Sequence, residues 1–222
     1  MIFILIYTLF ISLIFIFCIR QRELKNQKTN GGKMKKVVSD KPVINIYMVG
    51  IILCLFAVGV LLTFYFKDNT VIQNVRSITI VFVLAVAAYY DWLEFRIPNK
   101  LILLGLIQWL IITAYEIVSD NPWWIKNLIS ELIASLAMLI VCVLCILIIK
   151  NGLGMGDIKL LMLMGLIQGL DGAISAIFTS MVIIFFISIF LLFTKKKSKK
   201  DVLPFAPYIL IGTILSICTS GY

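Results

Sequence analysis

The sequence predicts an all-α fold, a polytopic membrane bundle of about eight transmembrane helices. Of the 222 residues, 62% are hydrophobic and only 14% are charged. Soluble globular proteins are closer to about half apolar and about a quarter charged. The apolar residues also fall into runs near the roughly 20 residues that a helix needs to cross the hydrocarbon layer. A soluble fold of this size could not bury so much apolar surface.

Eight apolar runs are candidate spans. They lie at 2–19, 44–66, 77–93, 100–118, 127–149, 158–170, 172–193 and 203–219. The first run has no basic start and no small-residue cleavage site, so we expect a retained helix rather than a signal peptide. The sixth run is short, and Asp171-Gly172 is the break that separates it from the seventh.

The basic residues predict the orientation of these spans. The formal net charge is +9, but the lysines and arginines occupy short loops between apolar runs, which argues against nucleic acid as a partner. If the segment 20–41 is cytoplasmic, alternation places 17 of the 20 basic residues inside and only Lys67, Arg76 and Lys126 outside. This excess follows the positive-inside rule and supports eight spans.

Several kinds of catalytic site are excluded by composition. The chain has no histidine, which rules out Ser-His and Cys-His catalysis and the usual zinc hydrolase sites. Its five cysteines all lie in apolar runs, where we expect them to serve as small hydrophobic side chains. The sequence therefore predicts no metal site and no cofactor.

Two acidic residues call for a chemical explanation, because ionisable groups at membrane depth are costly. Glu116, Glu131 and Asp171 fall near the outer ends of spans, where we expect interfacial carboxylates. Asp91 closes the third run and Asp157 opens the sixth, both at cytoplasmic ends. Two carboxylates at one depth suit a pair that activates water, with one ionised and the other protonated.

Glycines and prolines accompany these aspartates. Gly154 and Gly156 precede Asp157, where a backbone without Cβ atoms lets a substrate strand or another helix come close. A flexible turn before a helix N-terminal aspartate is the alternative. Pro204 and Pro207 at the last run either unwind it locally or simply start the helix.

Together these segments resemble the type IV prepilin peptidase family of GxGD aspartic proteases. Asp91 with the following Arg96-Ile97-Pro98-Asn99 is similar to the family's first catalytic motif. Gly154-Met155-Gly156-Asp157-Ile158-Lys159 is similar to its GxGD segment, and Pro204-Phe205-Ala206-Pro207 to its late P-F-x-P signature. The three motifs occur in the family's order.

The resemblance implies a membrane aspartic endopeptidase with Asp91 and Asp157 as catalytic residues and no metal. It would cut the basic leader from prepilin-like precursors (pilins, pseudopilins or archaellin-like proteins) at the cytoplasmic face of a prokaryotic inner membrane. Gly154, Gly156, Pro204 and Pro207 would line the substrate site. Membrane lipids are the other expected partners, and the sequence sets no oligomeric state.

The resemblance also divides the chain into two parts. Residues 1–43 are expected to form a transmembrane helix and a basic cytoplasmic loop, and residues 44–222 the polytopic peptidase core. Many bacterial members carry a larger domain with two Cys-x-x-Cys pairs, linked to N-methylation of the product. Here the segment 20–43 has no cysteine, so we expect a minimal form that cleaves without methylating.

Two alternatives stay open on the sequence. Tyr90-Asp91 also fits a presenilin or signal-peptide-peptidase-like protease, although the late Pro-Ala-Leu of that group is missing. A proton- or cation-coupled transporter is an alternative of another class, since such proteins also carry paired intramembrane acids and broken helices.

Overall fold

The computed structural model describes residues 50, 53, 55–60, 62, 70–119, 122–148, 154–193 and 204–220. The chain divides into two compact units, Met1–Lys67 and Asp68–Tyr222. In the first unit, residues 55–60 are helical, and the span expected at 2–19 and the loop at 20–43 lie outside the described residues. The second unit contains both candidate aspartates and is described here by itself.

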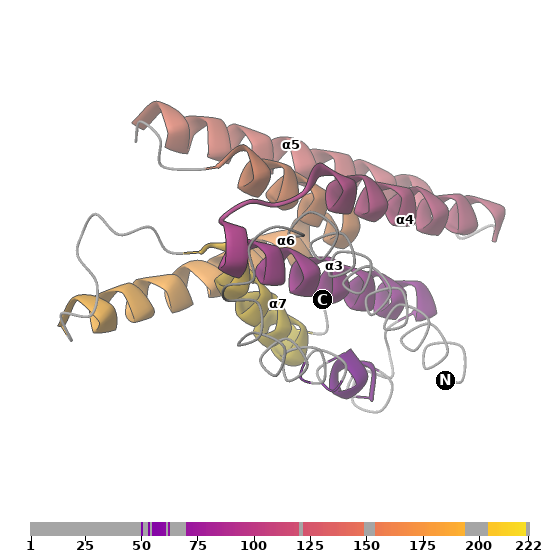
Figure 1. Cartoon of the computed structure of the whole chain (residues 1–222). Coiled ribbons are helices and arrows are strands. Elements are labelled where there is room, and N and C mark those ends of the chain that lie inside the picture. The colour runs from indigo at the N-terminus through magenta and orange to yellow at the C-terminus, as the bar shows by residue number, and fades with distance from the viewer. Residues whose placement is uncertain are drawn as a thin grey trace, which may run out of the picture. The chain divides into compact units, whose positions relative to one another are not determined.

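The described part of the second unit is built of helices and contains no strand, which confirms the predicted all-α class (Figure 1). The helices are α3 (Val71–Glu94), α4 (Asn99–Val118), α5 (Trp124–Ile148), α6 (Met155–Phe193) and α7 (Ala206–Ser220). α4, α6 and α7 pack against α3, and α5 packs against α4 and α6. α6 also packs against α7, so α6 contacts all four other helices of this unit and α3 contacts three.

α3 is the most deeply buried of the long helices. About four-fifths of its membrane-length segment is buried (78%), against 28% for α4 and α5. Its burial comes from the packing of α4, α6 and α7 against it. The helix begins earlier than the predicted residue 77, because the Thr70 side chain accepts from the Gln73 N–H and the Gln73 side chain accepts from the Thr70 N–H. This capping box brings Arg76 into the helix.

One glycine divides α6 into two arms. Gly169 has a φ of 70°, a left-handed conformation that glycine adopts readily and that interrupts the helical hydrogen bonds. The N–H of Leu170 donates instead to Ser130 Oγ on α5 at 3.1 Å. Figure 1 shows the two arms running in different directions from this point. The bend lies two residues before the break predicted at Asp171-Gly172.

Glycines at the helix contacts let the two arms of α6 lie close to α5 and α7, because glycine has no side chain. A Cβ on Gly165 would lie 2.8 Å from the backbone nitrogen of Ser135 on α5. A Cβ on Gly212 of α7 would lie 2.6 Å from the backbone nitrogen of Ser180 on α6. Close approach through small residues is a common way for membrane helices to associate. These contacts fix the first arm on α5 and the second arm on α7.

The number of spans differs from the prediction. Four helices among the described residues, α3 to α6, are long and apolar enough to cross a membrane, and eight spans are not supported. The runs expected at 158–170 and 172–193 correspond to the two arms of α6, which the non-helical backbone of Gly169 separates two residues before the predicted break. α7 has only 15 residues. The long apolar helices nevertheless identify a membrane protein.

Replacing Gly165 with alanine tests the packing of α6 on α5. The new methyl group would meet the α5 backbone, which cannot rotate away, so we expect Gly165→Ala to destabilise the fold by about 1–3 kcal/mol. Gly105→Ala is the matched control, because its methyl group would meet only the flexible end of the Leu163 side chain. Thermal unfolding in detergent measures both. Equal midpoints for the two variants would contradict this packing.

Candidate active site

Asp91 lies in the last turn of α3, where its side chain is only 6% exposed. The helix ends at Phe95, whose backbone is left-handed with a φ of 50° and whose N–H donates to the Asp91 carbonyl oxygen at 3.0 Å. This conformation is unfavourable for a residue with a Cβ, and the Phe95 side chain is exposed, so core packing does not explain it. The tight ending turns the chain directly into α4.

The carboxylate of Asp91 is bound by the start of α7. The Ala206 N–H donates to Asp91 Oδ2 at 2.9 Å in a buried position. The first N–H groups of a helix have no partner within the helix, and a helix N-terminus favours negative charge. Pro204 is buried just before α7, and Pro207 stands in its first turn. The two prolines therefore accompany a helix start, rather than a locally unwound span.

Asp157 lies in the first turn of α6, which also favours a carboxylate. Its N–H donates to the Gly154 carbonyl oxygen at 3.0 Å. A Cβ on Gly154 would lie 3.0 Å from Asp157 Oδ2, so a side chain at position 154 would crowd the carboxylate. Gly154 thus leaves room for the Asp157 side chain.

The segment between α3 and α4 is held against the start of α6. A Cβ on Gly156 would lie 3.1 Å from the Cβ of Ile97, so the missing side chain permits this contact. Lys159 Nζ donates to Asn99 Oδ1 at 3.0 Å. The Arg96-Ile97-Pro98-Asn99 segment and the glycine-aspartate segment are therefore direct neighbours in space.

The ends of α3, α6 and α7 meet around the two aspartates. The carboxylates of Asp91 and Asp157 are close enough for the charge of one to act on the other. Such a pair can divide its protonation, with one group accepting a proton and the other donating one. Within the described ranges, no group of three or more His, Cys, Asp or Glu side chains could hold a metal ion.

Comparison with protein families matches residues 78–192, just over half of the chain, to the type IV leader peptidase family. The chain belongs to the type IV leader peptidase family. Residues 78–192 include Asp91, Asp157 and nearly all of α6, whereas α7 lies beyond them.

A curated relative of this leader peptidase homologue is the prepilin leader peptidase/N-methyltransferase of Bacillus subtilis (strain 168). It is 26% identical over 140 residues, which cover 63% of this chain and 54% of the relative. The chain thus matches about half the length of that protein. No solved structure matches the chain.

Charged residues expected at the outer surface are in fact buried in this member of the leader peptidase family. Arg76 donates through Nη2 to Glu116 Oε2 at 2.8 Å and through Nη1 to Glu131 Oε1. Glu116 is 2% exposed and Glu131 is 1% exposed, so the prediction of interfacial carboxylates is wrong for both. Pairing with Arg76 makes this burial tolerable. These three residues are called the Arg76 cluster below.

The role of Ala206 was also not predicted from the sequence, because this residue binds the Asp91 carboxylate through its backbone N–H. Its place before Pro207 could have indicated this role, because the first N–H groups of a helix have no partner within the helix and need an acceptor elsewhere. Asp171, by contrast, is exposed on the second arm of α6, as expected for a solvated or interfacial carboxylate.

Replacing Ala206 with proline tests the hydrogen bond to Asp91. Proline suits the first position of a helix but has no N–H, so the donor is lost while the helix start is kept. A hydrogen bond to a charged group contributes about 1.5–3 kcal/mol, so we expect Ala206→Pro to lower peptidase activity by about 10- to 100-fold. Ala206→Gly keeps the N–H and is the control. Equal activity of the two variants would show that the hydrogen bond does not matter.

Proposed function

We propose that this chain is an aspartic endopeptidase that removes the leader from type IV prepilin-like precursors, with Asp91 and Asp157 as its catalytic pair. The observation that carries this proposal is the meeting of α3, α6 and α7 at these two carboxylates. Membership of the leader peptidase family supports the reaction class, and the relative's name supports the substrate class.

The chemistry follows from two carboxyl groups that share one proton. The ionised group takes a proton from a water molecule, whose oxygen then forms a bond to the scissile carbonyl carbon. The protonated group donates its proton to the carbonyl oxygen, which stabilises the charge that develops there. The C–N bond then breaks as the pair gives a proton to the leaving amine, and the carbonyl that re-forms returns its proton to the pair. The pair acts as a unit, so its roles belong to both residues together.

The position of the pair along its helices supports cleavage at the cytoplasmic membrane surface. Asp91 stands in the last turn of α3 and Asp157 in the first turn of α6, so both lie at helix ends and not at helix centres. The adjoining segments carry Arg96, Lys100 and Lys159, and basic loops prefer the cytoplasm. A substrate with a basic leader before an apolar helix would present its junction at this depth.

The substrate-binding roles of the glycines and prolines are part of the proposal. Gly154 leaves space beside the Asp157 carboxylate, which a substrate backbone could share. Gly156 and Pro207 support the site through the contact with Ile97 and the start of α7. Cleavage without methylation rests on the segment 20–43, which lies outside the described residues, and stays a prediction.

The family match favours a prepilin peptidase over the presenilin-like alternative. Where cleavage falls separates the two: at the edge of the substrate helix for a prepilin peptidase, and within the helix for a presenilin-like enzyme. Mass spectrometry of both products locates the cut.

Asparagine at either aspartate tests the proposed mechanism. Asp91→Asn and Asp157→Asn keep the side-chain shape but remove proton transfer, so we expect each to lower leader cleavage by at least about 100-fold. Asp171→Asn, at an exposed position of α6, is the matched control and should cleave like the wild type. The measurement is leader loss from precursors of the same genome, incubated with the purified protein in detergent.

If neither aspartate variant slows cleavage, another group performs the reaction and the proposed pair is wrong. If the wild type cleaves none of the precursors but conducts protons or cations in proteoliposomes, with flux lost in Asp157→Asn, the transporter alternative is correct.

A further inference from the structure

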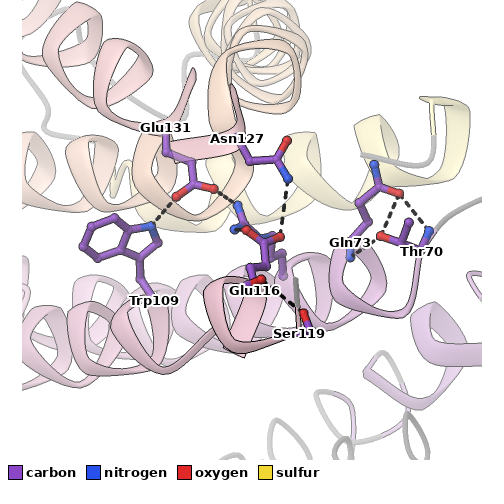
Figure 2. Close-up of polar contacts among 8 residues, drawn as sticks. Thr70, Gln73, Trp109, Glu116, Ser119, Asn127 and Glu131 are labelled. Carbon is purple, nitrogen blue, oxygen red and sulfur yellow. Dashed lines mark hydrogen bonds and ion pairs between the residues drawn. The ribbon is translucent and has the colours of Figure 1, made fainter. Parts of the chain in front are cut away.

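The Arg76 cluster joins three helices on the side of the unit away from the aspartates. Arg76 is on α3, Glu116 on α4 and Glu131 on α5, and Figure 2 shows both glutamates pointing into the space between their helices. From Arg76 to Asp91, α3 rises roughly 22 Å at about 1.5 Å per residue. The cluster therefore takes no part in contacting a substrate at the aspartates.

The remaining carboxylate oxygens of the cluster also have donors. Trp109 Nε1 donates to Glu131 Oε2 at 2.7 Å, and Asn127 Nδ2 lies 3.5 Å from Glu116 Oε1 (Figure 2). Each of the four carboxylate oxygens thus accepts from a different nitrogen, and two of these nitrogens belong to Arg76. If Arg76 moved away, both buried carboxylates would lose their cationic partner, which is strongly unfavourable. The cluster therefore favours one position of Arg76.

The cluster fixes α3 against α5 where helix packing does not. Among the described residues, α3 makes close backbone contacts with α4, α6 and α7 but none with α5. The Arg76 side chain crosses this gap. One helical turn away on α3 stand Ile72 and Ile80, so an axial shift of one turn would put an isoleucine against both carboxylates. At the apolar contacts of α3, such a shift would replace one apolar side chain by another. At the cluster, it would break both ion pairs of Arg76.

α5 also contacts α6, through Ser130, which is the residue before Glu131. Ser130 Oγ accepts from the Leu170 N–H at 3.1 Å, and the next residue, Glu131, holds Arg76 of α3. From Gly169 back to Asp157, α6 rises roughly 18 Å, close to the rise of α3 between Arg76 and Asp91. Each aspartate thus stands roughly three to four helical turns along its own helix from the residue that α5 contacts.

We propose that Ser130 and Glu131 of α5, with the Arg76 cluster, set the axial register of α6 and α3 so that Asp157 and Asp91 meet at one depth. Arg76, Glu116 and Glu131 are then positioning residues, which act on the reaction only through the placement of Asp91. Fixing helix register is the best-attested role of buried polar groups. The expected effect on kcat rests on the proposed function, whereas the expected effect on the alignment of α3 with α6 does not.

The structural test is a disulfide between positions 97 and 156. The Cβ atom of Ile97 and a Cβ built at Gly156 are 3.1 Å apart, near the spacing that a disulfide needs. Ile97→Cys and Gly156→Cys are introduced after all five native cysteines are replaced by alanine. The yield of this bond then reports how the end of α3 is aligned with the start of α6, and requires no activity.

The cluster is removed by Arg76→Met together with Glu116→Gln and Glu131→Gln. Glutamine keeps acceptors for Trp109 and Asn127, and replacing a whole buried ion cluster is often tolerated, so we expect the variant to fold. We expect its disulfide yield to fall several-fold. In the protein with native residues at 97 and 156, we expect kcat to fall by about 10- to 100-fold with little change in KM, because a shift of about 1 Å in the reacting groups has effects of this size.

The results separate the possible failures. If the triple variant folds and keeps the wild-type disulfide yield, the register proposal is overturned. If it does not fold, Arg76→Lys decides, since a lysine has one ammonium in place of the two-pronged guanidinium and cannot bridge both carboxylates equally. A wild-type yield in that variant overturns the proposal, and a reduced yield supports it. If the yield falls in the variant but the wild-type protein cleaves no precursor, the register proposal is supported and the proposed function is contradicted.

Discussion

The burial of the Asp91 carboxylate is the constraint on which the site depends. A carboxylate inside a membrane protein needs compensating donors or charges. The chain provides one at the start of α7, where the Ala206 N–H donates to Asp91 Oδ2. Because this donor is an unused helix N–H, binding it requires α7 to begin at the end of α3. The position of α7 is thus tied to the hydrogen bond that the buried Asp91 carboxylate requires.

Small residues bring the other half of the pair into place. Gly156 permits contact with Ile97, and Gly165 permits close packing of α6 on α5. The bend at Gly169 then lets the second arm of α6 turn away toward α7, whose first residue returns to Asp91. Among the described residues, Gly156, Gly165 and Gly212 thus permit close packing, and Gly154 leaves room for the Asp157 carboxylate.

The all-α class and the neighbourhood of Asp91 and Asp157 could be predicted, because apolar run lengths and ordered motifs are local properties of the sequence. The Arg76 cluster could not be predicted in this way. Arg76 pairs with residues 40 and 55 positions away, and only the fold shows that these charges are buried together. The break in α6 was predicted two residues too late, at Asp171-Gly172, because only the fold shows the left-handed backbone of Gly169 and the Ser130 hydroxyl that accepts from Leu170.

Whether Asp91 and Asp157 work as one unit is tested by the residual cleavage rates of Asp91→Asn, Asp157→Asn and the double variant. Residues that act as a unit are strongly non-additive. We expect the double variant to be no slower than either single variant, because one missing carboxylate already disables the pair. Losses that multiply in the double variant would contradict this expectation and would assign the two aspartates independent roles.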